Sequence, residues 1–426
     1  MGNALISRRG GGDGYSTVKF DKYGNYTLPT KGTATSLSQA RSNLAATTVG
    51  DYALFGGGYG SSSNYYSTVD TYSDILTKGT ATSLSQARSN LAATTVGDYA
   101  LFGGGYGSSS NYYSTVDTYT SSLTKSTATS LSSARSNLSA TTVGDYALFG
   151  GGYSGISNDY STVDTYTSSL TKSTATSLSQ ARHNLATTTV GSYALFGGGL
   201  FGANIDNVSA VVDAFNQNLA RLTPSSLNNG KQALIATSTP SYALFGGGYK
   251  ENYQSGTGYY DNNFADIDAY NQNLVKSTPT SLSSGRRNLG ATKLGPFAIF
   301  AGGYSLTGIH HSAQSGTSTY YSNVDIYYDS LAKSNGPNLQ SSRDYSAATT
   351  IGNYAIVAGG HNDSQYLSDA DVYINKDSML ELNVYKGSKY KFQNMSSEET
   401  VTSNMEVLSV LVPVTGYIKF KNTTIS

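Results

Sequence analysis

The stretch Tyr99-Ala-Leu-Phe-Gly-Gly-Gly105 decides the fold, because close copies of it recur along most of the chain. The copies begin at Tyr52, Tyr99, Tyr146, Tyr193, Tyr242, Phe297 and Tyr354. Successive copies start 47, 47, 47, 49, 55 and 57 residues apart. Self-similarity at such a period is typical of repeat folds, in which every copy is one structural unit.

Two further markers repeat with the same period. Eleven residues before each copy stands a cation, and after each glycine cluster comes an aspartate, nearly always preceded by valine. The cations are Arg41, Arg88, Arg135, Arg182, Lys231, Arg286 and Arg343. The aspartates are Asp70, Asp117, Asp164, Asp213, Asp268, Asp325 and Asp371. Three independent markers therefore indicate seven repeats.

Each repeat contains four short runs that favour β-strands. In one repeat these are residues 90–97, 99–102, 114–119 and 126–131, separated by turn residues and rich in small, β-branched or aromatic side chains. No stretch has a helical period. Four strands in a unit of this length match a propeller blade. The sequence predicts an all-β, seven-bladed β-propeller with four antiparallel strands per blade.

The order of arginine, hydrophobic strand, Gly-Gly and Val-Asp-x-Tyr resembles the kelch repeat over residues 27 to 378. The double glycine agrees with this resemblance, because closely packed strands leave no room for a Cβ atom. The chain has no tryptophan, and leucines such as Leu84, Leu131 and Leu178 stand where kelch repeats usually have it. The resemblance implies a kelch-like propeller that differs from the intracellular adaptor branch of that family.

The order of the runs at the two chain ends predicts how the propeller closes. The segment Leu28–Leu37 resembles a fourth strand without a first and second strand before it, whereas residues 343–374 supply strands one to three. We expect the N-terminal strand to complete the last blade, because an open propeller would expose a strand edge. Ser16–Val18 also resembles a third strand, which leaves open which third strand is used.

Three segments follow from this assignment. Residues 27–379 form the propeller, residues 1–26 form a Gly-rich N-terminal arm, and residues 380–426 form a small C-terminal β segment. Residues 1–14 are expected to be flexible or ordered only on a partner.

Composition excludes several functions. Lys and Arg number 27, as do Asp and Glu, so no net charge favours nucleic acid. No apolar run has the length of a secretory signal or of a membrane span. We expect the protein to be part of a virion or to be extracellular without a signal peptide. Otherwise we expect it to be cytoplasmic.

The usual catalytic centres of propellers are missing from the sequence. The galactose oxidases, which resemble this fold, need a cysteine-linked tyrosine at copper, and the chain has no cysteine. His310 and His311 could ligate a metal with a carboxylate, but two exposed loop histidines are the simpler interpretation. No nucleophile elbow or phosphate-binding loop is present. We therefore predict no enzyme activity, no metal and no cofactor.

The repeat cations have two interpretations. A cation and an aspartate that recur once per blade suggest internal ion pairs, because buried charges need partners. The alternative is a basic ring at the channel mouth that grips an anion. We favour internal pairing.

The connections between the glycines and the aspartate lengthen along the chain, from residues 58–70 in the first repeat to 248–268 and 303–325 later. In a propeller they lie at the same end as the blade-to-blade connections, so their lengthening thickens one face. Tyr, Ser, Gly and Asn dominate them, as in antibody paratopes. The candidate ligand-binding residues are Tyr249, Tyr253, Tyr259, Tyr260, Tyr304, His310, His311, Tyr320 and Tyr321.

Residues 32–72 and 79–119 are identical, so these two repeats can supply scaffold or the same contact twice, but not two different catalytic residues.

We expect a recognition propeller whose Tyr-rich loops bind a glycan or protein on a cell surface. The repeat style and Gly-rich N-terminus resemble kelch-like proteins of bacterial viruses and prophages, which implies particle partners for residues 1–14 and 380–426. The alternatives are a purely structural or decoration protein of the particle, and an enzyme with an unrecognised site.

Overall fold

A computed structural model describes residues 28–375 except 157, 255–257 and 311–315, together with the backbone strands of the two terminal segments. The chain divides into two compact units. One is Lys31–Tyr373, and the other combines Met1–Thr30 with Ile374–Ser426. Among the described residues, no helix is long and apolar enough to cross a bilayer.

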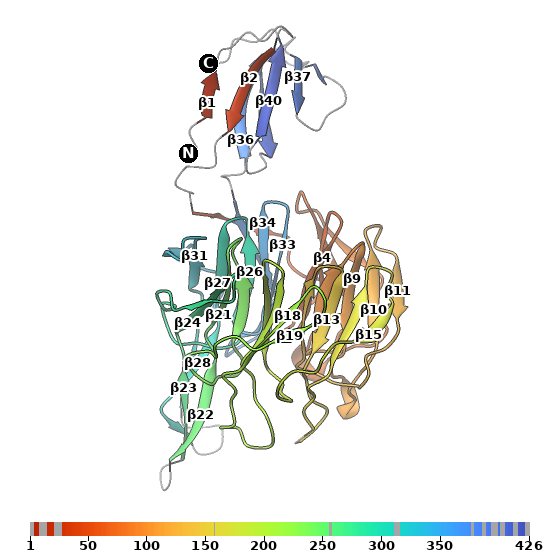
Figure 1. Ribbon diagram of the computed structural model, residues 1–426, viewed down its shortest axis with the longest axis vertical. Helices are drawn as coiled ribbons and strands as arrows, with labels where there is room; N and C mark the ends of the chain where they lie inside the picture. Colours follow the sequence, from red (N-terminus) through yellow and green to blue (C-terminus); the bar gives the residue numbers. More distant parts are fainter. Residues whose placement is uncertain are drawn as a thin grey trace. The chain divides into compact units, whose positions relative to one another are not determined.

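The unit Lys31–Tyr373 is the expected seven-bladed propeller, with each blade a four-stranded antiparallel sheet (Figure 1). Blade 1 comprises β4 (Ala45–Val49), β5 (Tyr52–Gly56), β6 (Val69–Ser73) and β7 (Lys78–Ala81). Blade 2 comprises β8 (Ala92–Val96), β9 (Tyr99–Gly103), β10 (Val116–Thr120) and β11 (Lys125–Ala128). Blade 3 comprises β12 (Ser139–Val143), β13 (Tyr146–Gly150), β14 (Val163–Thr167) and β15 (Lys172–Thr174). Blades 4 and 5 comprise β16 (Ala186–Val190), β17 (Tyr193–Gly197), β18 (Val212–Asn216) and β19 (Arg221–Leu222); and β20 (Ile235–Ser238), β21 (Tyr242–Gly246), β24 (Ile267–Asn271) and β25 (Lys276–Ser277). Blades 6 and 7 comprise β26 (Gly290–Leu294), β27 (Phe297–Ala301), β31 (Val324–Tyr327) and β32 (Lys333–Gly336); and β33 (Ala347–Ile351), β34 (Tyr354–Ala358), β35 (Ala370–Ile374) and β3 (Thr30–Ala34).

Short extra elements lie in the loops between the second and third strands. Blades 1 and 2 carry the single 3-10 turns η1 (Ser61–Ser63) and η2 (Ser108–Ser110). Blades 5 and 6 carry the hairpins of β22 (Tyr249–Gln254) with β23 (Gly258–Asn263) and of β28 (Tyr304–Thr307) with β30 (Thr317–Tyr320). The strand β29 (Ile309–His310) pairs with β23, so the loops of these two blades are joined.

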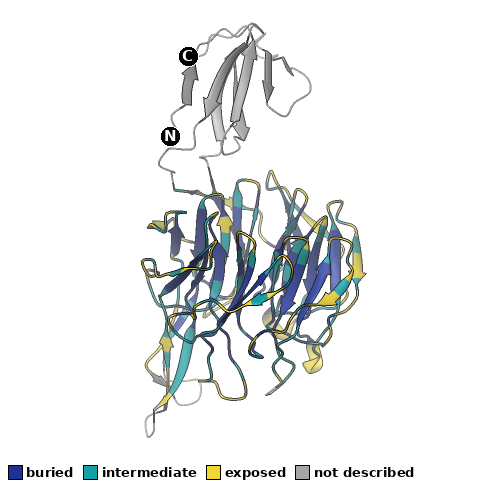
Figure 2. Ribbon diagram, in the orientation of Figure 1, coloured by how far each residue is buried: buried dark blue, intermediate teal, exposed yellow. Residues whose placement is uncertain are grey.

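Apolar side chains pack between neighbouring blades, and Figure 2 shows the strands buried and the turns exposed. The second strand ends in glycine in blades 1 to 5 and in alanine in blades 6 and 7. In blade 1 the glycine is required because the next blade leaves no space for a side chain. A Cβ atom on Gly56 would lie 2.8 Å from Cε1 of Phe102 in blade 2. The glycine that follows, Gly57, adopts a φ of +72°, which other residues rarely do.

The N-terminal strand completes the last blade, as expected, because the sheet of blade 7 has the order β3-β35-β34-β33. Lys31 on β3 lies 3.1 Å from the buried Asp371 on β35. The first strands of neighbouring blades contact each other around the whole circle, including β33 with β4. The ring is therefore closed by strands from opposite ends of the chain.

The structure places every repeat cation beside the aspartate of its own blade. In blade 3, Nη2 of Arg135 lies 2.7 Å from Asp164 and Nζ of Lys172 lies 2.9 Å from it, and Arg135 and Asp164 are fully buried. Burial lowers the pKa of Arg135, but a guanidinium remains charged. These contacts agree with internal pairing, and a basic ring at the channel mouth is absent from the described residues.

Blade 5 differs because its cation is lysine. Nζ of Lys231 lies 3.5 Å from Asp268 but only 2.8 Å from Asp266, an additional carboxylate close by in the same blade. An ammonium group lacks the planar fork of arginine, so it does not hold the carboxylate through the same geometry. In blade 6, Arg286 and Lys333 lower the pKa of Asp325 even though burial opposes this shift.

The other unit contains strands from both chain ends. The strands are β1 (Ala4–Ser7), β2 (Tyr15–Phe20), β36 (Met379–Tyr385), β37 (Lys389–Phe392), β38 (Glu399–Thr400), β39 (Met405–Leu411) and β40 (Gly416–Lys421). Its main sheet has the order β1-β2-β40-β37-β38. Residues 1–26 and 380–426, which the sequence analysis treated as separate segments, thus contribute to one unit. Ser16–Val18 pairs with β40 and is not a propeller strand, so the third strand of blade 7 is β35.

Candidate binding site at the axial cavity

Seven residues form a hydrogen-bonded backbone ring around the propeller axis. Each lies two positions after the repeat cation, and its N–H donates to the carbonyl of the equivalent residue in the preceding blade at 2.9–3.1 Å. The ring consists of Asn43, Asn90, Asn137, Asn184, Ala233, Asn288 and Tyr345. All seven have φ between +49° and +55°, a left-handed conformation that asparagine tolerates better than most residues. The repeated asparagine therefore follows from the conformation that closes the ring.

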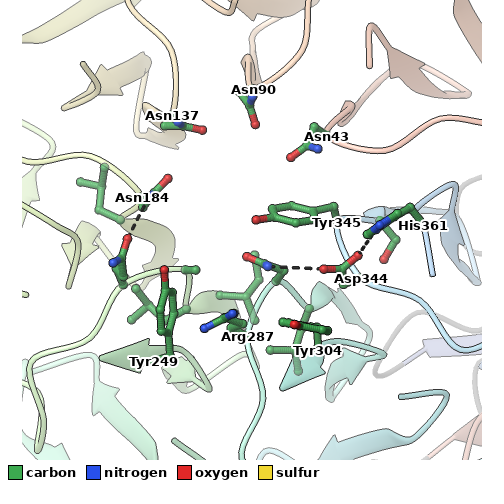
Figure 3. Close-up of a pocket in the computed structure, with 18 of the residues that line it drawn as sticks. Asn43, Asn90, Asn137, Asn184, Tyr249, Arg287, Tyr304, Asp344, Tyr345 and His361 are labelled. Atoms are coloured by element: carbon green, nitrogen blue, oxygen red, sulfur yellow. Dashed lines mark hydrogen bonds and ion pairs between the residues drawn. The ribbon is translucent and has the colours of Figure 1, made fainter. Parts of the chain in front are cut away.

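The side chains of this ring line a cavity of about 650 Å³ (Figure 3). Figure 3 shows Asn43, Asn90, Asn137 and Asn184 around one side of the opening. Each amide provides a carbonyl acceptor and an NH₂ donor. The Asn137 side chain lines the cavity between those of Asn90 and Asn184.

The opposite side of the cavity comes from blades 5 to 7 and carries individual side chains. The guanidinium of Arg287 lies 3.7 Å from the ring centroid of Tyr249 and 4.9 Å from that of Tyr304. Its Nη1 atom also lies 2.6 Å from Asp261. Burial raises the pKa of Tyr249, although Arg287 opposes the shift. Arg287 thus holds two cavity-lining tyrosines in place while its charge is neutralised.

The same side holds a buried carboxylate and a histidine. Oδ1 of Asp344 lies 2.6 Å from Nδ1 of His361, and Asp344 is only 2% exposed. Burial raises the pKa of Asp344, and the hydrogen bond with His361 opposes the shift. Burial, together with Asp344, raises the pKa of Tyr320 to about 12, so this phenol stays protonated at neutral pH.

Three of the predicted ligand-binding residues, Tyr249, Tyr304 and Tyr320, line this cavity. The structure brings them together from two blades because the loops between the second and third strands lie at the same end as the blade-to-blade connections. Isolated bridges join these two kinds of loop in each blade, for example Arg287 with Tyr304. The long loops therefore gather at one end of the propeller, as expected.

The other predicted residues lie elsewhere. Tyr253, Tyr259 and Tyr260 are exposed on the β22–β23 hairpin, and the rings of Tyr253 and Tyr259 lie 5.1 Å apart. Figure 1 shows this hairpin extending beyond the rest of the propeller. Tyr321 packs over the repeat cation Arg286 at 5.8 Å, which is a structural position.

His310 pairs through its backbone with Tyr259, and His311 lies outside the described residues. Within the described ranges, no three His, Asp or Glu side chains gather where they could hold a metal ion.

The ring of asparagine side chains, Arg287, Asp344 and His361 were not predicted from the sequence. A signal was present for the ring, since asparagine follows the repeat cation by two residues in five of the seven repeats. No comparable signal identifies the other three. Arg287 contacts Tyr249 and Asp261 of blade 5, and the Asp344–His361 pair occupies positions that hold other residues in the other six repeats.

No family model and no curated protein matches the chain. Solved structures do match it, 515 chains in all, so the architecture is widespread. One of them, described as the structure of YjhT, is 12% identical, with a TM-score of 0.52 over 66% of this chain and 93% of that chain. At this identity the likeness shows a propeller fold and carries no information about the ligand.

Proposed function

We propose that this propeller is a non-enzymatic recognition protein whose axial cavity binds an uncharged carbohydrate. The observation that carries the proposal is the cavity lining, in which a ring of asparagine amides faces tyrosines and every charged group has a charged or ionisable partner. Arg287 is paired with Asp261, and Asp344 is paired with His361. Among the described residues that line the cavity, no charge is therefore unpaired and able to attract an anion or a cation.

The chemistry of a sugar matches such a lining. Each hydroxyl is a donor and an acceptor, and an amide offers both functions in one plane. Tyrosine presents an apolar ring to the C–H face of a sugar and a hydroxyl to its polar edge. A cavity of about 650 Å³ falls in the range of small-molecule sites. The exposed Tyr253, Tyr259 and Tyr260 are candidate contacts for a larger ligand.

Replacing two ring amides tests this proposal. Gly is favourable at φ near +50°, and Ala233 shows that the backbone ring forms without an amide, so Asn90→Gly with Asn137→Gly should fold normally. We expect the intact protein to bind a neutral glycan on an array. The double variant should lose about 1 kcal/mol per amide, or roughly thirtyfold in affinity.

The matched control is Asn273→Ser, which changes an exposed asparagine in a turn where blade 2 has Ser122. Its affinity should equal that of the intact protein. Absence of any glycan binding, or equal affinity of the double variant and the control, contradicts the proposal. Chemical turnover of the bound glycan would instead favour an enzyme that uses the Asp344–His361 pair.

We also propose that the protein is a kelch-type component of a bacteriophage particle. It would attach through the unit that combines Met1–Thr30 with Ile374–Ser426. Both chain ends contribute strands to that unit, and the chain enters and leaves the propeller at neighbouring strands, β3 and β35. A chain lacking residues 1–26 and 380–426 should keep glycan binding but no longer cosediment with particles from producing cells. Persistent cosedimentation, or none for the full chain, contradicts attachment through these ends. Cosedimentation of a full chain that binds no glycan would favour a purely structural protein of the particle.

A further inference from the structure

A row of aromatic rings continues from the cavity across neighbouring blades. The rings of Tyr320 and His361, which line the cavity, lie 5.4 Å apart, and His361 lies 5.6 Å from Tyr366. The row then passes through blades 1 and 2 to blade 3, with successive centroids 5.0–5.9 Å apart. We call its six tyrosines the aromatic track: Tyr366, Tyr59, Tyr65, Tyr106, Tyr112 and Tyr153.

Blades 1 and 2 contribute the same local site twice. The centroids of Tyr59 and Tyr65 lie 5.0 Å apart at 62°, and those of Tyr106 and Tyr112 lie 5.1 Å apart at 62°. In each blade the first tyrosine donates its hydroxyl to a serine of the same loop, at 3.3 Å and 3.2 Å. Two identical sites side by side suit a ligand that repeats its own chemistry.

The core does not require the shape of these loops. Ser62 and Ser63 both have a left-handed backbone, with φ of 56° and 58°, and both are exposed. Ser109 and Ser110 repeat these angles in blade 2. Such a conformation costs about 1–2 kcal/mol for each residue that is not glycine. The same unfavourable conformation occurs at exposed positions in both blades, which is typical of loops shaped for binding.

The track is uncharged in these two blades. Residues 57–68 and 104–115 contain no Asp, Glu, Lys, Arg or His, but they contain tyrosine, serine, threonine and asparagine. A polyanion such as a nucleic acid would need cations here. Aromatic faces beside hydroxyl and amide groups instead match a neutral, polyhydroxylated chain.

The tyrosines of the track end at Tyr153 in blade 3, whose ring stacks on His183 at a centroid distance of 4.5 Å. In blade 3 the position of Tyr65 and Tyr112 is occupied by Asp159, which lies 2.6 Å from His183 of blade 4. In blade 4 the same position holds Val208. The other end of the track meets the cavity at His361.

We propose that the aromatic track binds successive sugar units of an uncharged polysaccharide, one end of which occupies the axial cavity. This inference rests on the proposed function, since it assigns the cavity ligand to a longer chain. The track lengthens the contact, so a polymer binds more tightly than its own short fragments.

The test compares polymers with their fragments. Dextran, mannan and galactan, each with its tetrasaccharide, serve as probes, and heparin serves as the anionic polymer. We expect one neutral polymer to bind at least about tenfold more tightly than its tetrasaccharide and more tightly than heparin. Tyr65→Val and Tyr112→Val should each weaken polymer binding by about fivefold. The double variant should lose more than either single variant, although not as a simple product, because both rings pack on Tyr106. Both single variants should leave tetrasaccharide binding unchanged.

The valine substitutions are compatible with the fold, because Val208 already occupies the equivalent place in blade 4. The control is Ile75→Ser, at an exposed position between the third and fourth strands where blade 2 has Ser122. The inference is overturned if the intact protein binds none of the neutral polymers, binds heparin better, or shows no loss in the valine variants. A different outcome would separate the two proposals. If polymer binding depends on Tyr65 and Tyr112, but no tetrasaccharide binds and the Asn90→Gly, Asn137→Gly variant binds the polymer as tightly as the intact protein, then the cavity is not a sugar site. The aromatic track would remain the binding surface.

Discussion

Replacing Arg135 by methionine should lower the free energy of unfolding by about 3–5 kcal/mol, because it leaves Asp164 charged and buried with a weakened set of partners. Asp164 is fully buried, and among the described residues it keeps the contacts with Lys172 and Ser132. Methionine fills much of the volume of arginine, so the loss reports mainly on the charge. Chemical denaturation of the full chain measures it.

A second substitution separates the charge from packing. Arg135→Met combined with Asp164→Leu removes both buried charges, and we expect it to recover at least about 2 kcal/mol, since an apolar pair of similar volume is often tolerated. The partly exposed Lys172 can then turn to water. A loss below about 1 kcal/mol in the single variant, or no recovery in the double variant, would show that the repeated ion pair does not hold the blade.

Removal of the N-terminal strand should have a comparably large effect. A chain that begins at residue 37 lacks β3, so β35 becomes an exposed strand edge and Asp371 loses Lys31. Each ladder hydrogen bond that is lost is worth about 1 kcal/mol net. We expect a lower midpoint of thermal unfolding and aggregation through the free edge.

A chain that begins at residue 27 is the matched control, because it retains all of β3. Its thermal midpoint should lie close to that of the full chain. Equal midpoints for the two truncated chains, with no aggregation of the shorter one, would contradict closure by the N-terminal strand.

The propeller could be predicted from the sequence because its contacts repeat. The Arg, Gly-Gly and Val-Asp markers each perform one role per blade: ion pairing, close approach of the next blade, and burial of the third strand. Closure by β3 was predictable because Leu28–Leu37 copies a fourth strand that has no other place. The position of the long loops at one end of the propeller was predictable, because successive turns of an antiparallel sheet lie at alternate ends.

The cavity was only partly predictable because it depends on contacts between blades. Tyr249 and Tyr304 were recognised by their loop composition, but Arg287 joins them only after blades 5 and 6 are placed side by side. Tyr321 has the same composition around it, yet it packs over Arg286. Loop composition does not distinguish a tyrosine that lines a cavity from one that covers a buried cation.

The pairing of β2 with β40 could not be predicted for a similar reason. These strands lie at opposite ends of the chain and belong to no repeat. A strand pattern such as Tyr15–Phe20 indicates a strand without indicating its partner. Without a second copy elsewhere in the sequence, no comparison reveals the partner.

A crystal structure of the full chain with a bound tetrasaccharide, chosen from the glycan array, would show whether the axial cavity is the sugar-binding site. We expect sugar density in the axial cavity, with hydroxyls bonded to the amides of Asn90 and Asn137 and one face against Tyr304 or Tyr320. Density confined to another surface, with the cavity holding only water, would contradict this expectation.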